Sequence, residues 1–446
     1  MSGALTNLVA FIVAISVLVA VHEYGHYIVG RWCGMKVLRF SIGFGKPVWT
    51  KIAGEDRTEY CISAIPLGGY VKFLDEREGP VDEAERSRAF NHRPIPARIA
   101  VLLAGPAFNF LFALVAYWVL SMQGLPTLRP VIGEVEPDSY AAEAGLQADE
   151  LLVAVGDQQV NDWSTALLSI LDQMVGTGEV PLVVEDINGI RRDLVIEVGD
   201  DSARLTEPGV LLSGLGFTPG QPLAIAEWID PDAAAAAAGM LPGDRVVSVN
   251  GQETVTFNDM AAIIVELPDQ TVPFGIVRDG RRQTIYIDVA RVETATGVVG
   301  RIGVGPRYLK KFGAVAAVSE SVSRTARETV FTVRMLWNMV TGEVSIKNIS
   351  GPISIAQFVG DSARAGFTYV LTILALISIS LGVLNLLPIP MLDGGQIVYQ
   401  SVEWIKGSPM SERAQMLGQQ VGILAILLLM SFAFYNDIAR LFNQGP

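Results

Sequence analysis

Hydrophobic and polar positions follow two different patterns along this chain. Four long apolar runs cover residues 4–29, 99–120, 367–389 and 421–435, the last reaching span length only with its flanks. Each is close to the roughly 20 residues that cross a bilayer as a helix. Between the second and third runs, short apolar segments alternate with glycine, proline and acidic residues, which is typical of strands and turns. The pattern predicts four membrane-spanning helices with a large, mainly β insertion.

The charges around these runs predict how they cross the membrane. The first run has neither a basic leading region nor a small-residue cleavage site, so we interpret it as a retained span rather than a signal peptide. About a dozen lysines and arginines lie within residues 31–98, which places this short loop in the cytosol. The acidic, lysine-free region 129–306 is then outside. The amino terminus is expected outside, with the first and third spans running inward.

Overall composition excludes two classes of protein. A net charge of −13 argues against a nucleic-acid partner. The only cysteines are Cys33 and Cys61, both on the expected cytosolic side, so no disulfide framework is predicted.

The acidic region contains an internal repeat. The segment "EPDSYAAEAGLQADELLVAVGDQ" from Glu136 aligns without gaps with "DPDAAAAAAGMLPGDRVVSVNGQ" from Asp230, and each is followed later by a short Gly-rich stretch that we predict to be a strand. The pattern of turn, short helix, glycine stop and apolar strand resembles two tandem PDZ domains in the circularly permuted bacterial arrangement, at residues 129–220 and 221–307. The candidate peptide-binding edges are Gly214, Leu215, Gly216 and Phe217 in the first domain, and Ile302, Gly303 and Val304 in the second. Alternatively, both domains only shield or space the membrane part and bind no peptide.

Three ionisable residues interrupt the first apolar run in the segment "HEYGH". His22 and His26 are four residues apart, so on a helix both imidazoles face one side and can bind one metal ion. Glu23 lies beside them, where it can hold a water molecule. Ionisable side chains within a span are energetically costly, so we interpret this group as functional.

A catalytic zinc site needs a third protein ligand and an open position for water. We expect His92 to be an exposed loop residue. Cys33 lies about 10 Å from His26 along the helix axis, too far for a shared ion, and is interpreted as ordinary packing. Asp393 in "NLLPIPMLDGGQ" is the remaining candidate. Because the first and third spans both run inward, the two sets of ligands can meet at one depth.

These residues resemble the motifs of the site-2 protease family of intramembrane zinc metalloproteases, which pairs His-Glu-x-x-His with a later Leu-Asp-Gly. Further similar segments are "AGPAFNF", "SIGFG", "PLGGYVKF" and "SGPISIA". The resemblance implies a Zn²⁺ cofactor held by His22, His26 and Asp393, with Glu23 as general base and Asn385 positioning substrate. It also implies a bacterial inner-membrane enzyme, with periplasmic PDZ domains and an active site near the cytosolic face. Its implied substrates are pre-trimmed single-span proteins of the anti-sigma factor type and signal-peptide remnants.

A substrate helix must be unwound before its peptide bonds can be cut, because its carbonyls are tied into intrahelical hydrogen bonds. The alternation in "VLRFSIGFG" and the strand-like "PLGGYVKF" predict a membrane-associated sheet whose edge pairs with the unwound substrate. The candidate substrate-binding residues are Phe40, Ile42, Gly43, Gly68 and Gly69. A solvent-exposed hairpin without substrate contact is the alternative.

The complete prediction is a polytopic α-helical membrane protein with four transmembrane helices, a membrane-associated β-sheet and two inserted PDZ domains. Its membrane halves are expected at 1–125 and 351–446, with an amphipathic surface helix in 308–350. The chain is compatible with a monomer in the lipid bilayer. Rival interpretations are a metal transporter and a catalytically idle PDZ scaffold. Transporters usually repeat their membrane halves, whereas here the repeat lies in the acidic region, and the intact Glu23 argues against an idle scaffold.

Overall fold

The computed structural model of the chain describes residues 3–187, 189–207, 209–294, 297–408 and 410–443. Its contacts divide the chain into two compact units. The first comprises residues up to 123, residues 312–334 and residues from 349 onward, and the second comprises 124–311 and 335–348. The outermost ends of the predicted membrane halves, 1–2 and 444–446, lie outside the described residues.

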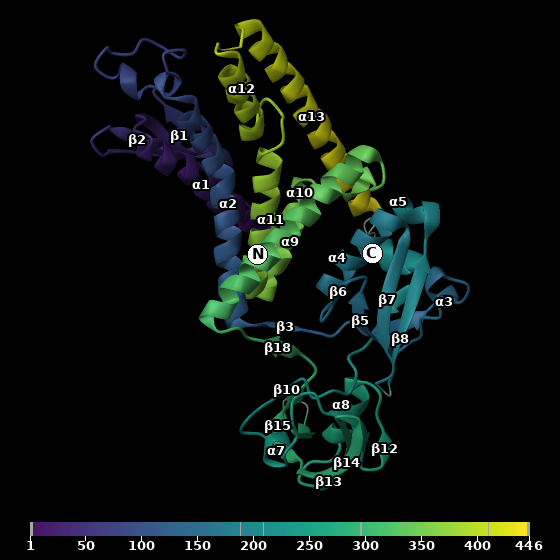
Figure 1. Ribbon diagram of the computed structural model, residues 1–446. Helices are drawn as coiled ribbons and strands as arrows, with labels where there is room; N and C mark the ends of the chain where they lie inside the picture. Colours follow the sequence, from purple (N-terminus) through teal and green to yellow (C-terminus); the bar gives the residue numbers. More distant parts are fainter. Residues whose placement is uncertain (1–2, 188, 208, 295–296, 409, 444–446) are drawn as a thin grey trace. The chain divides into compact units, whose positions relative to one another are not determined.

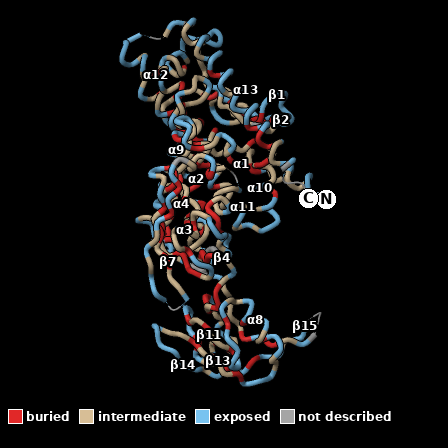
Figure 2. The backbone as a smooth tube through the Cα atoms, turned by 90° about the vertical axis from the view of Figure 1, so that its right-hand side faces the viewer, coloured by how far each residue is buried: buried red, intermediate tan, exposed pale blue. Residues whose placement is uncertain are grey.

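The first unit contains four helices that are long and apolar enough to cross a membrane: α1 (Gly3–Trp32), α2 (Ile95–Gln123), α11 (Phe367–Asn385) and α13 (Glu412–Asn443). Helix α2 packs against both α1 and α11 (Figure 1). Little of α13 is buried, as its tan and pale blue trace in Figure 2 shows. Outward-facing apolar side chains are what a lipid environment requires, so the prediction of four candidate spans is confirmed.

The end of the third span differs from the prediction. The apolar run continues to residue 389, but α11 ends at Asn385. Pro388 and Pro390 cannot donate a backbone N–H and disfavour a helical residue before them, so the chain turns instead. A separate helix, α12 (Asp393–Lys406), starts after this turn. Asp393 is therefore the first residue of α12 and does not belong to the spanning helix.

A long hairpin of β1 (Val37–Ala53) and β2 (Thr58–Phe73) follows α1. The hairpin folds back on itself, so the first half of β1 pairs on both sides. Phe40 lies opposite both Val71 and Tyr60, and Ile42 lies opposite both Gly69 and Ile62. The predicted strands are present, but Phe40 and Ile42 lie in the interior of the sheet. Its two edges are residues 69–73 and 47–53.

Two further helices contribute to the first unit, one of them only with its residues up to 334. The predicted amphipathic helix is α9 (Ala314–Thr341), which packs on the end of α2, where Tyr117 donates a hydrogen bond to Glu328. Helix α10 (Pro352–Ala365) begins at the "SGPISIA" segment. The carboxylate of Asp437 in α13 accepts from the N–H groups of Gly351, Ile353 and Ser354, at 2.8–3.1 Å. A carboxylate from a distant helix thus caps α10, whose own first residues offer no side-chain cap.

The second unit contains two β modules, each with its own hydrophobic core. The first module is built from β4 (Ile132–Val135), α3 (Tyr140–Glu143), β5 (Leu151–Val155), β6 (Gln158–Gln159), α4 (Trp163–Thr177), β7 (Glu179–Glu185), β8 (Arg191–Glu197), α5 (Ser202–Leu205), α6 (Leu211–Leu215) and β9 (Phe217–Pro219). The second is built from β10 (Trp228–Ile229), α7 (Ala234–Ala237), β11 (Arg245–Val249), β12 (Gln252–Glu253), α8 (Phe257–Val265), β13 (Thr271–Arg278), β14 (Arg281–Asp288), β15 (Ala290–Thr294), β16 (Gly297–Arg301) and β17 (Val304–Gly305). The chain enters and leaves through the paired strands β3 (Leu125–Thr127) and β18 (Tyr308–Lys310).

The sequence repeat reappears as a repeat of topology. The sheet order β6-β5-β7-β8 in the first module matches β12-β11-β13-β14 in the second. A buried acid precedes the equivalent strand in each: Glu150 before β5 and Asp244 before β11. Glu150 pairs with Arg192, and Asp244 pairs with Arg278 at 2.5 Å. Because the two acids occupy aligned positions of the repeat, the modules share an ion pair between a buried acid and a partly exposed arginine, which was not evident from the sequence.

The Gly-rich stretches differ from their predicted form. Gly214 and Leu215 are helical, at the end of α6, and Gly216 is its left-handed cap. Only Phe217 is in a strand, where it pairs with Val135. In the second module Ile302 is buried in the core and Gly303 has a positive φ.

Val304 alone of its predicted segment lies in a strand, opposite Ile229. Of the residues predicted to form peptide-binding edges, only Phe217 and Val304 therefore lie in strands. Peptide binding at these two segments stays a prediction.

We predict that Asp244→Ala loosens the second module locally. The substitution leaves the Arg278 guanidinium without its carboxylate and removes the acceptor for the Leu241 N–H, which Asp244 binds at 2.8 Å. Hydrogen–deuterium exchange of the full chain in detergent should show faster exchange across 239–249. The matched control is Asp269→Ala, whose pair with Arg291 is exposed and contributes little. Equal exchange in both variants would contradict this prediction.

Candidate active site

The histidines of the first span lie on one face of α1, as predicted from their spacing. Their Nε2 atoms are 3.1 Å apart, and the rings meet edge to face with centroids 4.8 Å apart. His26 is buried, and its side chain is 10% exposed. Glu23, between them in sequence, is also buried and interacts with the backbone of Val71 in β2.

Asp393 joins this pair from the start of α12. Its Oδ2 lies 3.2 Å from Nε2 of His22 and 3.5 Å from Nε2 of His26. Gly394 and Gly395 allow the approach, because a Cβ at either would collide with the backbone of the preceding turn. The three ligand atoms form the one candidate metal-binding group of histidine, cysteine and acidic side chains within the part of the chain that the structure describes.

The geometry of these three atoms fits a zinc ion. Ligand atoms about 2.05 Å from a tetrahedral ion are roughly 3.3 Å apart, and the observed separations are 3.1–3.5 Å. Asp393 Oδ2 is buried and lacks a hydrogen-bonded partner of good geometry. Two imidazoles and one carboxylate are also a donor set of catalytic zinc sites, which keep one position open.

Helix α2 supports the two imidazoles from behind. The Nδ1 atom of His26 lies 2.7 Å from the carbonyl oxygen of Val101, and Nδ1 of His22 lies 3.1 Å from the side-chain amide of Asn109. Gly105 lies between these two positions. A Cβ there would come within 2.7 Å of carbon atoms of both rings, so only glycine allows α2 to approach this closely.

A cleft of about 830 Å³ opens onto the three ligand atoms. Its walls include Glu23, the edge residues Gly69 and Val71, and Asn385 at the end of α11. Phe40, Ile42, Gly43 and Gly68 are not among its lining residues. Of the five predicted sheet residues, therefore, only Gly69 contacts the cleft. The reason is the double pairing of β1, which leaves residues 69–73 as the edge on this side.

The two rejected ligand candidates lie elsewhere. Nε2 of His92 donates a hydrogen bond of 2.6 Å to the Glu76 carboxylate, a contact within the loop before α2. Cys33 is a partly buried free thiol after the end of α1 and is not part of the metal-binding group.

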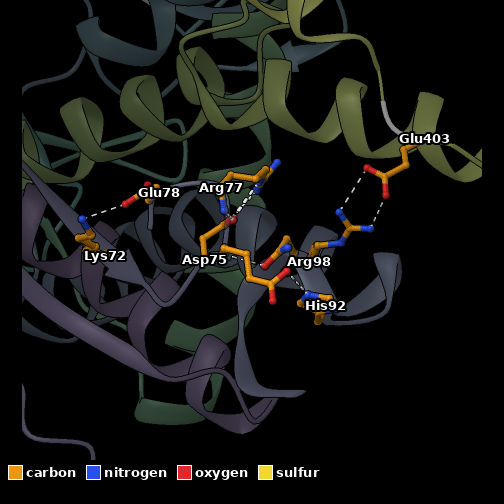
Figure 3. A network of polar contacts seen from close by, with 9 residues as sticks. Lys72, Asp75, Arg77, Glu78, His92, Arg98 and Glu403 are labelled. Atoms are coloured by element: carbon orange, nitrogen blue, oxygen red, sulfur yellow. Dashed lines mark hydrogen bonds and ion pairs between the residues drawn. The ribbon is translucent and has the colours of Figure 1, made fainter. Parts of the chain in front are cut away.

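A network of charged residues lies beside the cleft, and four of its members line it (Figure 3). Lys72, Asp75, Arg77 and Glu78 line the cleft and pair with one another. Burial raises the pKa of Asp75, but its hydrogen bonds to Arg77 outweigh this effect, so the net pKa lies below its ordinary value.

The buried member of this network is Arg98 in α2. Its guanidinium binds both carboxylate oxygens of Glu403 in α12, at 2.7 and 3.3 Å, and its side chain is only 6% exposed. The helix that carries Asp393 at its start is thus attached to α2 near its other end.

Comparison with known proteins agrees with this geometry. The family model described as "Peptidase family M50" matches residues 10–429. The chain belongs to peptidase family M50. It is 37% identical over 453 residues to the regulator of sigma-E protease RseP of Escherichia coli, covering 99% of this chain and 100% of that protein. Protease RseP of Yersinia pestis is 38% identical, with coverage of 99% and 100%.

A relative from Vibrio cholerae that is named as a zinc metalloprotease is 37% identical over 454 residues, with 99% of this chain and 100% of the relative covered. Together with the four apolar helices, these findings make this M50 peptidase an intramembrane zinc metalloprotease of the site-2 protease type and a multi-pass protein of the inner membrane. The sequence-based family, enzyme class and cofactor are confirmed.

Sequence reasoning overlooked the residues that hold the ligands in place. Asn109 is a polar side chain in the middle of an apolar span, which is itself a signal of function. Arg98 and Glu403 are 305 positions apart and carried no such signal.

We predict that reversing one charge of the buried pair destabilises the peptidase, whereas reversing both restores part of the loss. Arg98→Glu or Glu403→Arg alone places two like charges together where solvent is largely excluded, a change that costs about 3–5 kcal/mol. Thermal unfolding of the single and double variants in detergent gives the coupling free energy between the two side chains. The exposed pair of Lys72 and Glu78 is the control and should show little coupling. If the stability losses of Arg98→Glu and Glu403→Arg simply add in the double variant, this pair does not attach α12 to α2.

Proposed function

We propose that this M50 peptidase binds its zinc through His22, His26 and Asp393, and that it cleaves peptide bonds within the transmembrane segments of single-span proteins. The observation that carries the proposal is the convergence of Nε2, Nε2 and Oδ2 within 3.1–3.5 Å, with Glu23 beside them on a cleft. Zinc in that position supplies a Lewis acid that acidifies water and polarises a peptide carbonyl.

The chain's own residues perform the proton transfers. Glu23 takes the proton from the attacking water and returns it to the amine that leaves, because it is the carboxylate beside the ligand group that is not itself a ligand. Asn385 lines the same cleft and is proposed to bind the substrate backbone.

The edge formed by residues 69–73 is proposed to hold the unwound substrate. Within the described residues it pairs with β1 on one side only, and it lines the cleft beside Glu23. An extended substrate added to this edge would exchange its intrahelical hydrogen bonds for strand pairing. Of the five predicted residues, the proposed contact retains Gly69. The edge replaces the others, which are Phe40, Ile42, Gly43 and Gly68.

The two β modules are proposed to be PDZ domains in the periplasm. Their shared topology, their separate cores and the sequence repeat support a tandem of equivalent domains. They would act as a filter that excludes substrates whose outer part is untrimmed. The substrates would be proteins of the anti-sigma factor type and signal-peptide remnants, with the cleft opening toward the cytosol.

The proposed role of Glu23 predicts that Glu23→Gln abolishes cleavage but keeps the metal. Glutamine preserves the shape of the side chain and cannot accept the proton, so cleavage of a single-span substrate in detergent should fall by at least 10²-fold. Zinc content of the purified variant should match that of the parent. The control is Glu83→Gln, which changes a side chain that is 92% exposed. Metal flux into liposomes without proteolysis by the parent would instead support the transporter.

The proposed edge predicts that Val71→Pro slows cleavage selectively. Proline removes the backbone N–H of an edge residue and so weakens pairing with the substrate. Cleavage of a helical transmembrane substrate should slow more than cleavage of one carrying helix-breaking residues. Disturbance of the neighbouring Glu23 would slow both substrates alike, so the ratio of the two rates isolates the edge. An unchanged ratio would eliminate it.

A further inference from the structure

The side chain of Asn109 lies within the membrane helix α2 and faces the candidate zinc ligands. Its residue is fully buried, with 0% of its surface exposed. Within the described residues, the amide's only side-chain hydrogen-bond partner is Nδ1 of His22, which lies 3.1 Å from Nδ2. Its Oδ1 is buried and has no hydrogen-bond partner. A polar amide in an apolar span is costly unless it has a function.

The chemistry of the imidazole fixes which atom of the amide must face it. Nε2 of His22 points toward Asp393 and His26, so a metal ion among them would use the electron pair on Nε2. A neutral imidazole bound through Nε2 carries its proton on Nδ1 and needs an acceptor there. An amide nitrogen is only a donor, whereas an amide oxygen accepts.

His26 provides the internal comparison. Its Nδ1 faces the backbone carbonyl of Val101 at 2.7 Å, and a carbonyl is only an acceptor. The proton of His26 is therefore on Nδ1, which leaves Nε2 for the ion. Val101 of α2 thus fixes the tautomer of His26. For His22 to bind the ion through Nε2 in the same way, its Nδ1–H also needs an acceptor, and the group of α2 that faces it is Asn109.

We infer that Asn109 is a positioning residue for the zinc site: its amide oxygen accepts a hydrogen bond from Nδ1–H of His22 and fixes the tautomer that binds the ion. The amide oxygen and nitrogen have nearly the same shape, so a half-turn of the amide gives the orphaned Oδ1 this partner without moving any other atom. The inference rests on the proposed assignment of His22 as a zinc ligand.

The test is zinc affinity of the full chain in detergent, measured by competition with a chelator. Asn109→Leu keeps the volume but removes the acceptor, and should weaken zinc binding roughly 10–100-fold, as loss of such support typically does. Asn109→Asp keeps an acceptor at the same place and should retain zinc within a few-fold. If Asn109 had only a structural role, the zinc affinities of Asn109→Asp and Asn109→Leu would be alike.

Two further variants separate the possible failures. Ser378→Ala removes a buried hydrogen bond of 2.8 Å to the backbone oxygen of Asn109 without touching His22, and should leave zinc affinity unchanged. His22→Ala should abolish tight binding. Wild-type affinity in Asn109→Leu alongside loss in His22→Ala would overturn the role of Asn109 and leave the site intact. Equal weakening in Asn109→Leu, Asn109→Asp and Ser378→Ala would overturn it in favour of helix packing. Retained zinc in His22→Ala would overturn the proposed ligand set itself.

Discussion

The close packing of α1 against α2 is the constraint on which the catalytic centre depends. Two helices in lipid gain little from burying apolar side chains, so they approach through small residues. Here a Cβ at Gly25 would collide with the backbone of Ala104, and a Cβ at Gly105 would collide with both imidazoles. This approach lets the backbone carbonyl of Val101 and the amide of Asn109 reach the histidine rings. A larger residue at either glycine would separate the rings from the groups that orient them.

The third candidate ligand depends on a break in regular structure. Asp393 reaches the imidazoles because the chain leaves α11 at Asn385, turns through two prolines and begins α12. Irregular backbone within a membrane is tolerated where protein covers it or where it lines a cavity. Met391 and Leu392 of this turn line the cleft. The break that positions Asp393 therefore also forms part of the cleft wall. The pair of Arg98 and Glu403 then holds the helix beyond the break against α2.

The sequence was sufficient for the parts of the fold that depend on spacing. The four apolar runs predicted the spans, four-residue spacing predicted the histidine face, and Asp393 was identified as the residue that the structure places beside His22. The sequence was insufficient where the position of a residue depends on contact with a distant segment of the chain. The double pairing of β1 depends on the hairpin folding back, and strand alternation looks the same for an interior strand as for an edge strand.

One other prediction failed, and one role was not predicted, for a similar physical reason. Gly214 and Leu215 were expected in a strand because glycine and apolar residues fit one, but they lie against Leu205 and Val210 within a short helical connection. The role of Asn109 depends on which face of α2 meets α1, and α2 is apolar on nearly every side. The local sequence pattern therefore identified the candidate ligands but not the residues that orient them.

The position of the unpaired strand edge has a consequence for the peptidase as a molecule among its own copies. A bare edge of backbone N–H and carbonyl groups joins indiscriminately with other strands and is a common cause of self-association. In this chain the edge at 69–73 lies along the wall of a cleft, beside α1. Its position within a cleft makes this edge a surface that an extended chain would have to enter the cleft to reach, unlike a strand edge on an open face.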